Sequence, residues 1–126
     1  MAAEAAPTEV RLKRAERVLD VSFADGARYV LPAEYLRVES PSAEVQGHGP
    51  GQKTLVAGRR AVGIMRVEPV GHYAVRIVFD DLHDSGIYDW DYLRRLGREQ
   101  AERWAAYEAE LAARGLSRDP PPSRRR

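Results

Sequence analysis

Residues 73–97 pass from one apolar repeat to another, and this change predicts a strand followed by a helix. Apolar side chains first occupy alternate positions, as in a strand with one face on a core, at Val75, Ile77 and Phe79. They then recur every three residues, as on the buried stripe of a helix, at Trp90, Leu93 and Leu96. Asp89 precedes this stripe, and aspartate is a residue type that caps helix N-termini. We therefore expect a strand, a turn and a capped helix in this order.

A polar turn joins the strand to the helix. Its side chains are acidic or small and polar, apart from one imidazole, and they belong to Asp80, Asp81, His83, Asp84, Ser85 and Gly86. Short polar side chains hydrogen-bond the local backbone in turns, and glycine permits unusual dihedral angles. The same cluster also offers an imidazole and carboxylates to a metal ion. Turn structure and ligand binding both follow from this pattern, and turn structure is the more common use of such residues.

Apolar alternation predicts further strands along the chain. They are expected at residues 10–13, 19–23, 27–31, 54–56 and 62–67. The pair Asp25-Gly26 lies between two of these runs, and such a pair is a strong signal for a tight hairpin. Residues 27–31 should therefore return antiparallel to the preceding strand. The predicted sheet is mostly antiparallel.

Helical segments are expected at two further places. Pro32 suits a helix start, so residues 32–38 should form a short helical turn. Residues 39–53 are rich in glycine and proline and show no periodicity, which predicts a long loop. Apolar side chains then recur at intervals of three and four, at Trp104, Tyr107 and Leu111. Gly97 either separates this C-terminal helix from the helix before it or lies within one long helix.

The length of 126 residues suits one domain with one core. We expect a small, mostly antiparallel α+β domain with a short helix after the HDSGIYDW turn and a C-terminal helix. The expected boundaries are a disordered N-terminus at 1–8, the sheet-rich domain at 9–97, the C-terminal helix at 98–115 and a disordered basic tail at 116–126.

The composition argues against several classes of function. Twenty Lys and Arg residues against nineteen Asp and Glu leave a formal net charge of +1, so no overall charge attracts nucleic acid or an anionic membrane. The absence of cysteine excludes disulfides, thiolate catalysis and cysteine-bound metal within this chain. No stretch approaches the roughly twenty apolar residues of a membrane span. We expect a cytoplasmic protein that binds neither nucleic acid nor membrane.

The sequence contains no recognisable catalytic motif. The glycine-rich stretch from Gly47 to Gly51 resembles a phosphate-binding loop only superficially, because Gln52 stands where that motif needs glycine before its lysine. The consecutive residues His83, Asp84 and Ser85 have the types of a hydrolase triad, but adjacent side chains diverge. We therefore expect no enzymatic activity, and the role of the glycine-rich stretch stays open.

Several phrases of the sequence occur in one order, namely LRVESPSAEVQGHGPGQ, VGIMRVEPVGHYAVRIVFDD and HDSGIYDWDYLRRLG. They resemble the gamma-butyrobetaine hydroxylase-like N-terminal domain family over roughly residues 8–97, and the length is similar to that of free-standing bacterial members. The resemblance implies a small, sheet-rich α+β fold. In hydroxylase members this domain precedes an iron- and 2-oxoglutarate-dependent oxygenase domain, and in some plant proteins a similar domain is joined to a P-loop iron–sulfur carrier. The resemblance covers neither catalytic partner.

The resemblance also implies where a zinc ion is held in the hydroxylases, through three cysteines after a Leu-Arg pair and one histidine of the later acidic turn. It places the cysteine positions on Ser40, Ser42 and Val45 and the histidine position on His83. A serine hydroxyl is a poor zinc ligand and valine is none, so we expect no zinc site of the usual kind. His83 then either orders the turn through hydrogen bonds, which we favour, or joins carboxylates at a metal.

Two functional hypotheses follow. The first is a non-enzymatic accessory or interaction domain, linked by analogy to iron or iron–sulfur metabolism. It would dock an unknown protein partner through His83, Asp84, Ser85, Gly86, Ile87, Tyr88 and Trp90. Exposure of Tyr88 or Trp90 would support it, and burial would count against it.

The second hypothesis is a metal-binding protein that holds iron or zinc. Its ligands would be His83 and the carboxylates of Asp80, Asp81 or Asp84. It requires at least three donor atoms at roughly 2.0 to 2.2 Å from one point. The sequence leaves open the identity of a partner and is compatible with a homo-oligomer.

Overall fold

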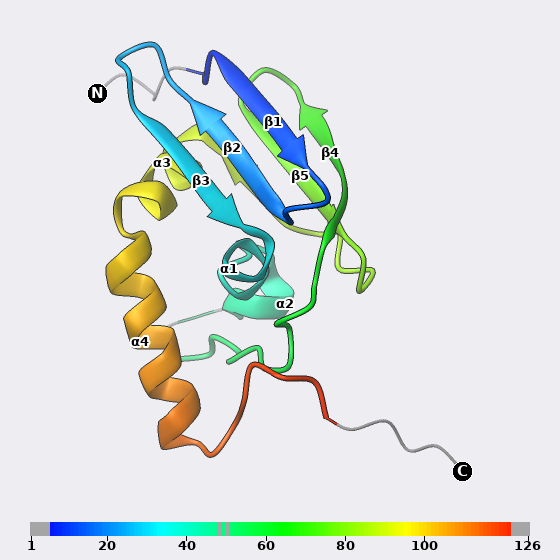
Figure 1. Ribbon diagram of the computed structural model, residues 1–126, viewed down its shortest axis with the longest axis vertical. Helices are drawn as coiled ribbons and strands as arrows, with labels where there is room; N and C mark the ends of the chain where they lie inside the picture. The colour runs from blue at the N-terminus through cyan, green and yellow to red at the C-terminus, as the bar shows by residue number, and fades with distance from the viewer. Residues whose placement is uncertain (1–5, 48, 50, 122–126) are drawn as a thin grey trace.

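Two three-stranded antiparallel sheets occupy one end of the molecule (Figure 1). The computed structural model describes residues 6–47, 49 and 51–121. The first sheet has the order β1-β2-β3, with the bounds Glu9–Lys13, Val18–Ser22 and Arg28–Pro32. The second has the order β4-β5-β6, with the bounds Ile64–Val70, Ala74–Phe79 and Ile87–Asp89. The predicted α+β class with mostly antiparallel strands is confirmed.

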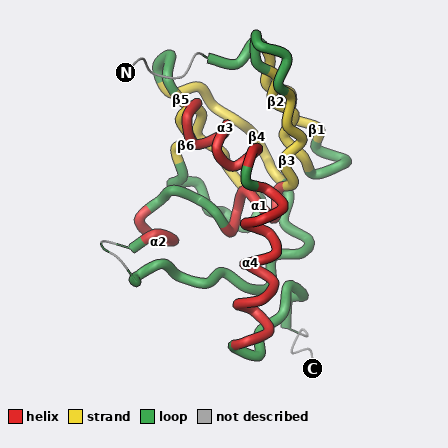
Figure 2. Tube along the Cα trace, turned by 90° about the vertical axis from the view of Figure 1, so that its left-hand side faces the viewer, coloured by secondary structure: helices red, strands yellow, loops and turns green. Residues whose placement is uncertain are grey.

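Helices fill the rest of the fold. They are α1 (Ala33–Val38), α2 (Ala43–Gln46), α3 (Trp90–Arg98) and α4 (Gln100–Ala113). Figure 2 shows α4 running away from the sheets, with α2 at the other side of the helical end. None of the helices in the described ranges is long and apolar enough to cross a membrane.

The main core lies between the two sheets and the helices α1 and α3. Its fully buried side chains include Leu19, Leu31, Leu36, Ile77, Phe79, Leu93 and Leu96. A second, smaller cluster lies at the helical end and contains Val38, Val45, Val56, Tyr107 and Leu111. Each buried apolar side chain of this size contributes roughly 1.5 to 3 kcal/mol relative to an exposed one. Through this second cluster, α4 and the loop residue Val56 pack against α1 and α2.

The predicted hairpin between β2 and β3 is confirmed. Gly26 has a φ of +93°, which an L-residue with a side chain rarely adopts. The amide of Gly26 donates to the carbonyl of Phe23 over 3.1 Å, and the amide of Phe23 donates to the carbonyl of Ala27 over 2.8 Å. These bonds fix the register in which Val18 faces Pro32.

The strand predicted at residues 54–56 is wrong, because these residues pair with no strand. The Thr54 amide instead donates to the carbonyl of Val45 over 2.6 Å. Val56 packs in the second cluster, and its carbonyl accepts the hydroxyl of Tyr107 over 2.6 Å. The loop predicted over residues 39–53 also contains one helical turn, α2, which its sequence did not indicate. Tertiary contacts with α4, rather than local periodicity, shape this segment.

The predicted cap of α3 is confirmed, since Asp89 Oδ1 accepts the Tyr92 amide over 2.8 Å. Of the two alternatives for Gly97, the structure has two helices, but they separate at Glu99 and Gly97 lies inside α3. The C-terminal helix is therefore shorter than the predicted range of 98–115. A side chain at Gly97 would collide with Tyr29, which explains a glycine in a helix.

The C-terminal segment packs against the fold, whereas the sequence predicted disorder from residue 116. The amides of Gly58 and Arg60 donate to the carbonyls of Ser117 and Arg118, each over 2.9 Å. The Arg118 guanidinium pairs with the buried carboxylate of Glu34 through two hydrogen bonds of 2.9 and 2.7 Å. A buried carboxylate needs such a partner, and this need orders the segment. At the other end Thr8 extends the β1–β2 ladder by bonding to Ser22. Residues 1–5 and 122–126, also predicted to be disordered, lie outside the described part of the chain.

Candidate functional site

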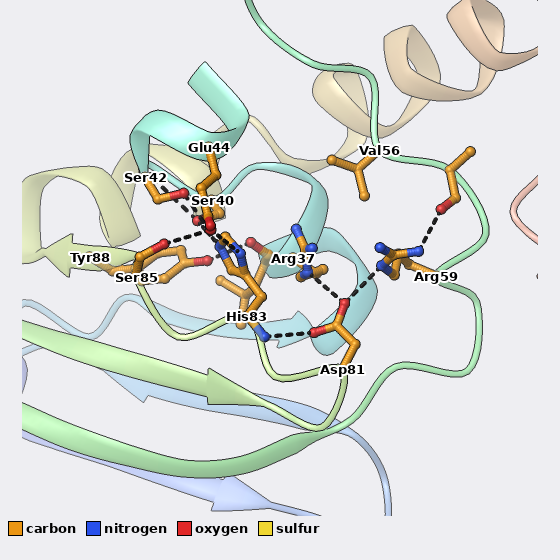
Figure 3. Close-up of polar contacts among 12 residues, drawn as sticks. Arg37, Ser40, Ser42, Glu44, Val56, Arg59, Asp81, His83, Ser85 and Tyr88 are labelled. Atoms are coloured by element: carbon orange, nitrogen blue, oxygen red, sulfur yellow. Dashed lines mark hydrogen bonds and ion pairs between the residues drawn. The ribbon is translucent and has the colours of Figure 1, made fainter. Parts of the chain in front are cut away.

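The imidazole of His83 bridges the turn after β5 and the junction of α1 and α2 (Figure 3). Its Nε2 lies 2.9 Å from the Ser40 hydroxyl oxygen and 3.4 Å from that of Ser42. Its Nδ1 lies 3.0 Å from Glu44 Oε1, which also accepts the hydroxyl of Ser85 over 2.9 Å. We call His83, Ser40, Ser42 and Glu44 the His83 cluster. The cluster ties together segments that lie about forty residues apart in the chain.

The hydrogen bonds of the His83 cluster assign the protonation state of the ring. Nδ1 faces a carboxylate and donates its proton there, so Nε2 accepts the Ser40 hydroxyl proton. Burial, followed by the nearby guanidinium of Arg37, lowers the pKa of His83. The imidazole is therefore neutral at pH 7, and its two nitrogens have complementary roles.

Asp81 holds the turn in place from below the imidazole (Figure 3). Its Oδ2 accepts Arg37 Nε over 2.9 Å and Arg59 Nε over 2.8 Å, and its Oδ1 accepts the His83 amide over 3.2 Å. Burial acts to raise the pKa of Asp81, but these hydrogen bonds outweigh it and lower that pKa. Leu82 in the same turn has a φ of +72°, an uncommon conformation for a residue with a side chain. Surrounding bonds hold this backbone where local preference alone would not.

The residues that the sequence grouped as one motif separate into inward and outward sets. His83, Gly86 and Tyr88 point inward and are buried, and the Tyr88 hydroxyl donates to the carbonyl of Leu36 over 2.6 Å. Burial raises the pKa of Tyr88. Asp84, Ser85 and Ile87 are exposed. Trp90 is half-buried and donates its indole N–H to the carbonyl of His72 over 2.9 Å. Burial of Tyr88 counts against its use in docking. The residues of this motif that a partner can reach are Asp84, Ser85 and Ile87.

The order of Ser40, His83 and Glu44 resembles the nucleophile, base and acid of a hydrolase. The Ser40 side chain is fully buried, however, and its hydroxyl oxygen also accepts the Ser42 amide over 3.3 Å. A Cβ at Gly86 would come within 2.5 Å of the same oxygen, so backbone covers it. A nucleophile must reach its substrate, and this hydroxyl has no path to one in the observed conformation. The arrangement is suited to holding the turn after β5 against the α1–α2 junction.

Comparison with known proteins identifies the family to which this fold belongs. The family model described as "Gamma-butyrobetaine hydroxylase-like, N-terminal" matches residues 10–94. The chain belongs to this family. One related NMR solution structure is 46% identical, covers 98% of each chain and has a TM-score of 0.83. A second is 44% identical, covers 95% of this chain and 89% of its own, and has a TM-score of 0.81.

A crystal structure of a protein of unknown function from Acidithiobacillus ferrooxidans is also similar. That protein is assigned to the DUF971 family, is 43% identical over 72% of this chain and 91% of its own, and has a TM-score of 0.61. No curated protein matches the chain. The comparisons therefore establish the family and the fold, and the family is one of unknown function.

The cysteine positions implied by the family resemblance do meet the histidine in space, but the residues there do not fit zinc. Ser40 and Ser42 contact His83, whereas Val45 is buried and apolar. Neutral hydroxyls and an isopropyl group cannot replace three thiolates. Within the described ranges, no group of three or more His, Cys, Asp or Glu residues can hold a metal ion. Asp81 contacts the His83 backbone rather than the ring, and its carboxylate is taken by two guanidiniums.

A cavity of about 480 Å³ opens beside the His83 cluster. Its polar and charged lining includes Arg37, Glu44, Arg59, Asp81, His83 and Asp84, and its apolar lining includes Leu55, Val56 and Leu82. Sequence reasoning missed Arg37, Glu44, Arg59 and Leu82. A signal for Arg37 was available, since this charged residue lies in the apolar run from Tyr35 to Val38 and must be buried with a partner. No local signal pointed to Arg59.

Proposed function

We propose that the protein is a non-enzymatic accessory domain that docks a protein partner beside the turn at residues 80–87. The observation that carries the proposal is Leu82, whose side chain is 79% exposed on a backbone of positive φ. Unfavourable dihedral angles persist where surrounding structure imposes them, and they concentrate at functional sites. Ile87, 45% exposed at the far end of the turn, adds a second apolar side chain.

The support beneath the turn favours a docking role. Asp81 bonds to two guanidiniums and the His83 cluster links the turn to α2, so the backbone that carries the exposed side chains is held before any partner binds. A surface ordered in advance loses less conformational entropy on binding. The polar groups below the turn therefore support binding by the residues above it.

The class of partner follows from analogy with family fusions. Relatives resembling this domain are joined to an iron-dependent oxygenase or to an iron–sulfur carrier, so proteins of iron or iron–sulfur metabolism are the first partners to test. The near-neutral net charge does not favour nucleic acid, and the proposed setting is the cytoplasm. We include no metal in this role because the described residues offer no suitable ligand set.

Quantitative co-purification from the source cells tests the proposal, with Leu82→Asp as the variant. Met65→Asp is the matched control, since Met65 is also exposed (42%) but lies on β4 and is not among the cavity-lining residues. We expect a defined set of proteins to be recovered with wild type and with Met65→Asp, and to be lost with Leu82→Asp. Equal recovery with both variants, at unchanged stability, would contradict docking at this turn.

A further inference from the structure

Arg37 lines the cavity beside the turn and carries one unpaired hydrogen-bond donor beneath the cavity surface. Its side chain is 9% exposed, and its Nε donates to Asp81. Its Nη1 is buried and has no hydrogen-bond partner among the residues that the structure describes. A buried donor without an acceptor costs about 1 to 3 kcal/mol, and more when it is charged. Such a group calls for an acceptor from outside the described residues.

The cavity is lined by the carboxylates of Glu44, Asp81 and Asp84 and by two guanidiniums, so local pairing decides where an anion can bind. The single carboxylate of Asp81 serves the guanidiniums of Arg37 and Arg59, which we call the arginine end, so one positive charge is left over there. Figure 3 shows the acidic Glu44 beside His83 and away from Arg59. Figure 3 shows Arg37 between His83 and Arg59, with Asp81 below both guanidiniums. An anion in this cavity is therefore directed to the arginine end.

The donors at the arginine end and the apolar lining indicate the chemistry of the anion. Guanidiniums bind carboxylates and phosphates through parallel hydrogen bonds, and a carboxylate oxygen would satisfy the Nη1 of Arg37 once the side chain shifts to bring this buried atom to the cavity. The cavity of about 480 Å³ exceeds what one carboxylate group fills, and Leu55, Val56 and Leu82 line the remainder with apolar surface. A glutamate side chain on a peptide matches both features, because its stem and an apolar neighbour cover this surface.

We propose that the cavity binds an acidic side chain of a partner polypeptide, with the carboxylate at Arg37 and Arg59 and an apolar neighbour against Leu82. This inference rests on the proposed docking function and adds the chemistry that the partner must supply. Asp84 also lines the cavity and repels an anion there, so removal of its charge should strengthen binding.

NMR titration of the intact wild-type protein tests the proposal without a variant. The probes are the peptide acetyl-Leu-Glu-Leu-amide, its Gln counterpart and sodium acetate, followed through the Arg37 side-chain N–H signals and the amides of residues 81–84. We expect the Glu peptide to shift these signals and to bind at least about tenfold more tightly than the Gln peptide, which corresponds to one charge-assisted hydrogen bond. Acetate should bind more weakly than the Glu peptide, since it lacks the apolar contacts.

Substitutions then test which residues form the binding site. Arg59→Gln should weaken the Glu peptide severalfold, and Asp84→Asn should strengthen it. The neighbouring Arg60→Gln should leave it unchanged, because Arg60 bonds to Asp119 and is not among the cavity-lining residues. Arg37→Lys keeps the charge that faces Asp81 but loses the planar fork, so it should also weaken the peptide.

The outcomes separate this inference from the proposed function. Equal binding of the Glu and Gln peptides would overturn the carboxylate site and leave docking at the turn intact. Acetate binding as tightly as the peptide would show a small-acid site and overturn the peptide assignment. The absence of any shift at residues 81–84 and Arg37 would overturn the inference outright, while the Leu82→Asp experiment judges docking separately.

Discussion

Gly97→Ala should destabilise the protein, although alanine is the better helix former. Gly97 lies in α3, and a Cβ there would fall 2.3, 2.5 and 2.6 Å from Cγ, Cδ1 and Cδ2 of Tyr29. These separations are far inside van der Waals contact. Overpacking of this kind typically costs about 1 to 3 kcal/mol, whereas the gain in helix propensity is about 1 kcal/mol. We expect the free energy of unfolding to fall by up to about 2 kcal/mol, since the Tyr29 ring also packs edge-on against Phe23 and is not free to move away.

Urea unfolding followed by circular dichroism measures this change, and a double-mutant cycle with Tyr29→Ala tests its cause. In the Tyr29→Ala background the clash is absent, so Gly97→Ala should become stabilising by up to about 1 kcal/mol. The sign of the effect should therefore reverse between the two backgrounds at unchanged m-value. A stabilising Gly97→Ala in the wild-type background would refute the close approach of α3 to β3.

Three further predictions concern the His83 cluster and the C-terminal segment. The pKa of His83 lies below 6.5 in the folded protein, so the unfolded chain binds more protons and stability falls as pH drops below 6.5; urea unfolding should show a steeper slope in wild type than in His83→Asn, where the carboxyls with lowered pKa still contribute in acid. The triple variant Ser40→Cys, Ser42→Cys, Val45→Cys should bind one zinc ion, measured by metal content and a chelator-sensitive melting temperature, and wild type should bind none. Arg118→Ala should lower stability by about 1 to 3 kcal/mol in thermal and urea unfolding, because it leaves a buried carboxylate on α1 unpaired; a loss below about 0.5 kcal/mol would indicate that the segment is not docked.

The parts of the fold that the sequence predicted depend on local signals. Asp25-Gly26 requires a backbone that few other pairs adopt, and Asp89 caps the helix three residues before the amide it binds. The alternation in β5 predicts its inner face because successive side chains of a strand point to opposite sides. Each of these signals lies within a few consecutive residues of the sequence.

The parts that could not be predicted depend on contacts between distant segments. Ser40 and His83 lie 43 positions apart, and Arg37 and Asp81 lie 44 apart. Nothing local indicates that a histidine in an acidic turn will bond to a serine rather than to its neighbouring carboxylates. The segment 54–56 has the residue types of a strand, but it lacks a partner strand and is held by α4. The family resemblance placed Ser40, Ser42 and His83 at the positions of one implied zinc site, but neither it nor the residues alone predicted the hydrogen bonds between them.

The His83 cluster occupies the place where the family resemblance implies a zinc site in the hydroxylase members. A zinc ion with one histidine and three cysteines would tie the acidic turn to the α1–α2 junction through four bonds. Here the neutral imidazole makes the same connection, because Nε2 accepts from Ser40 and Nδ1 donates to Glu44. Hydrogen bonds are weaker than metal–ligand bonds, so the turn needs the second anchor that Arg37 and Arg59 provide at Asp81. We therefore expect that acid, rather than a chelator, loosens the turn.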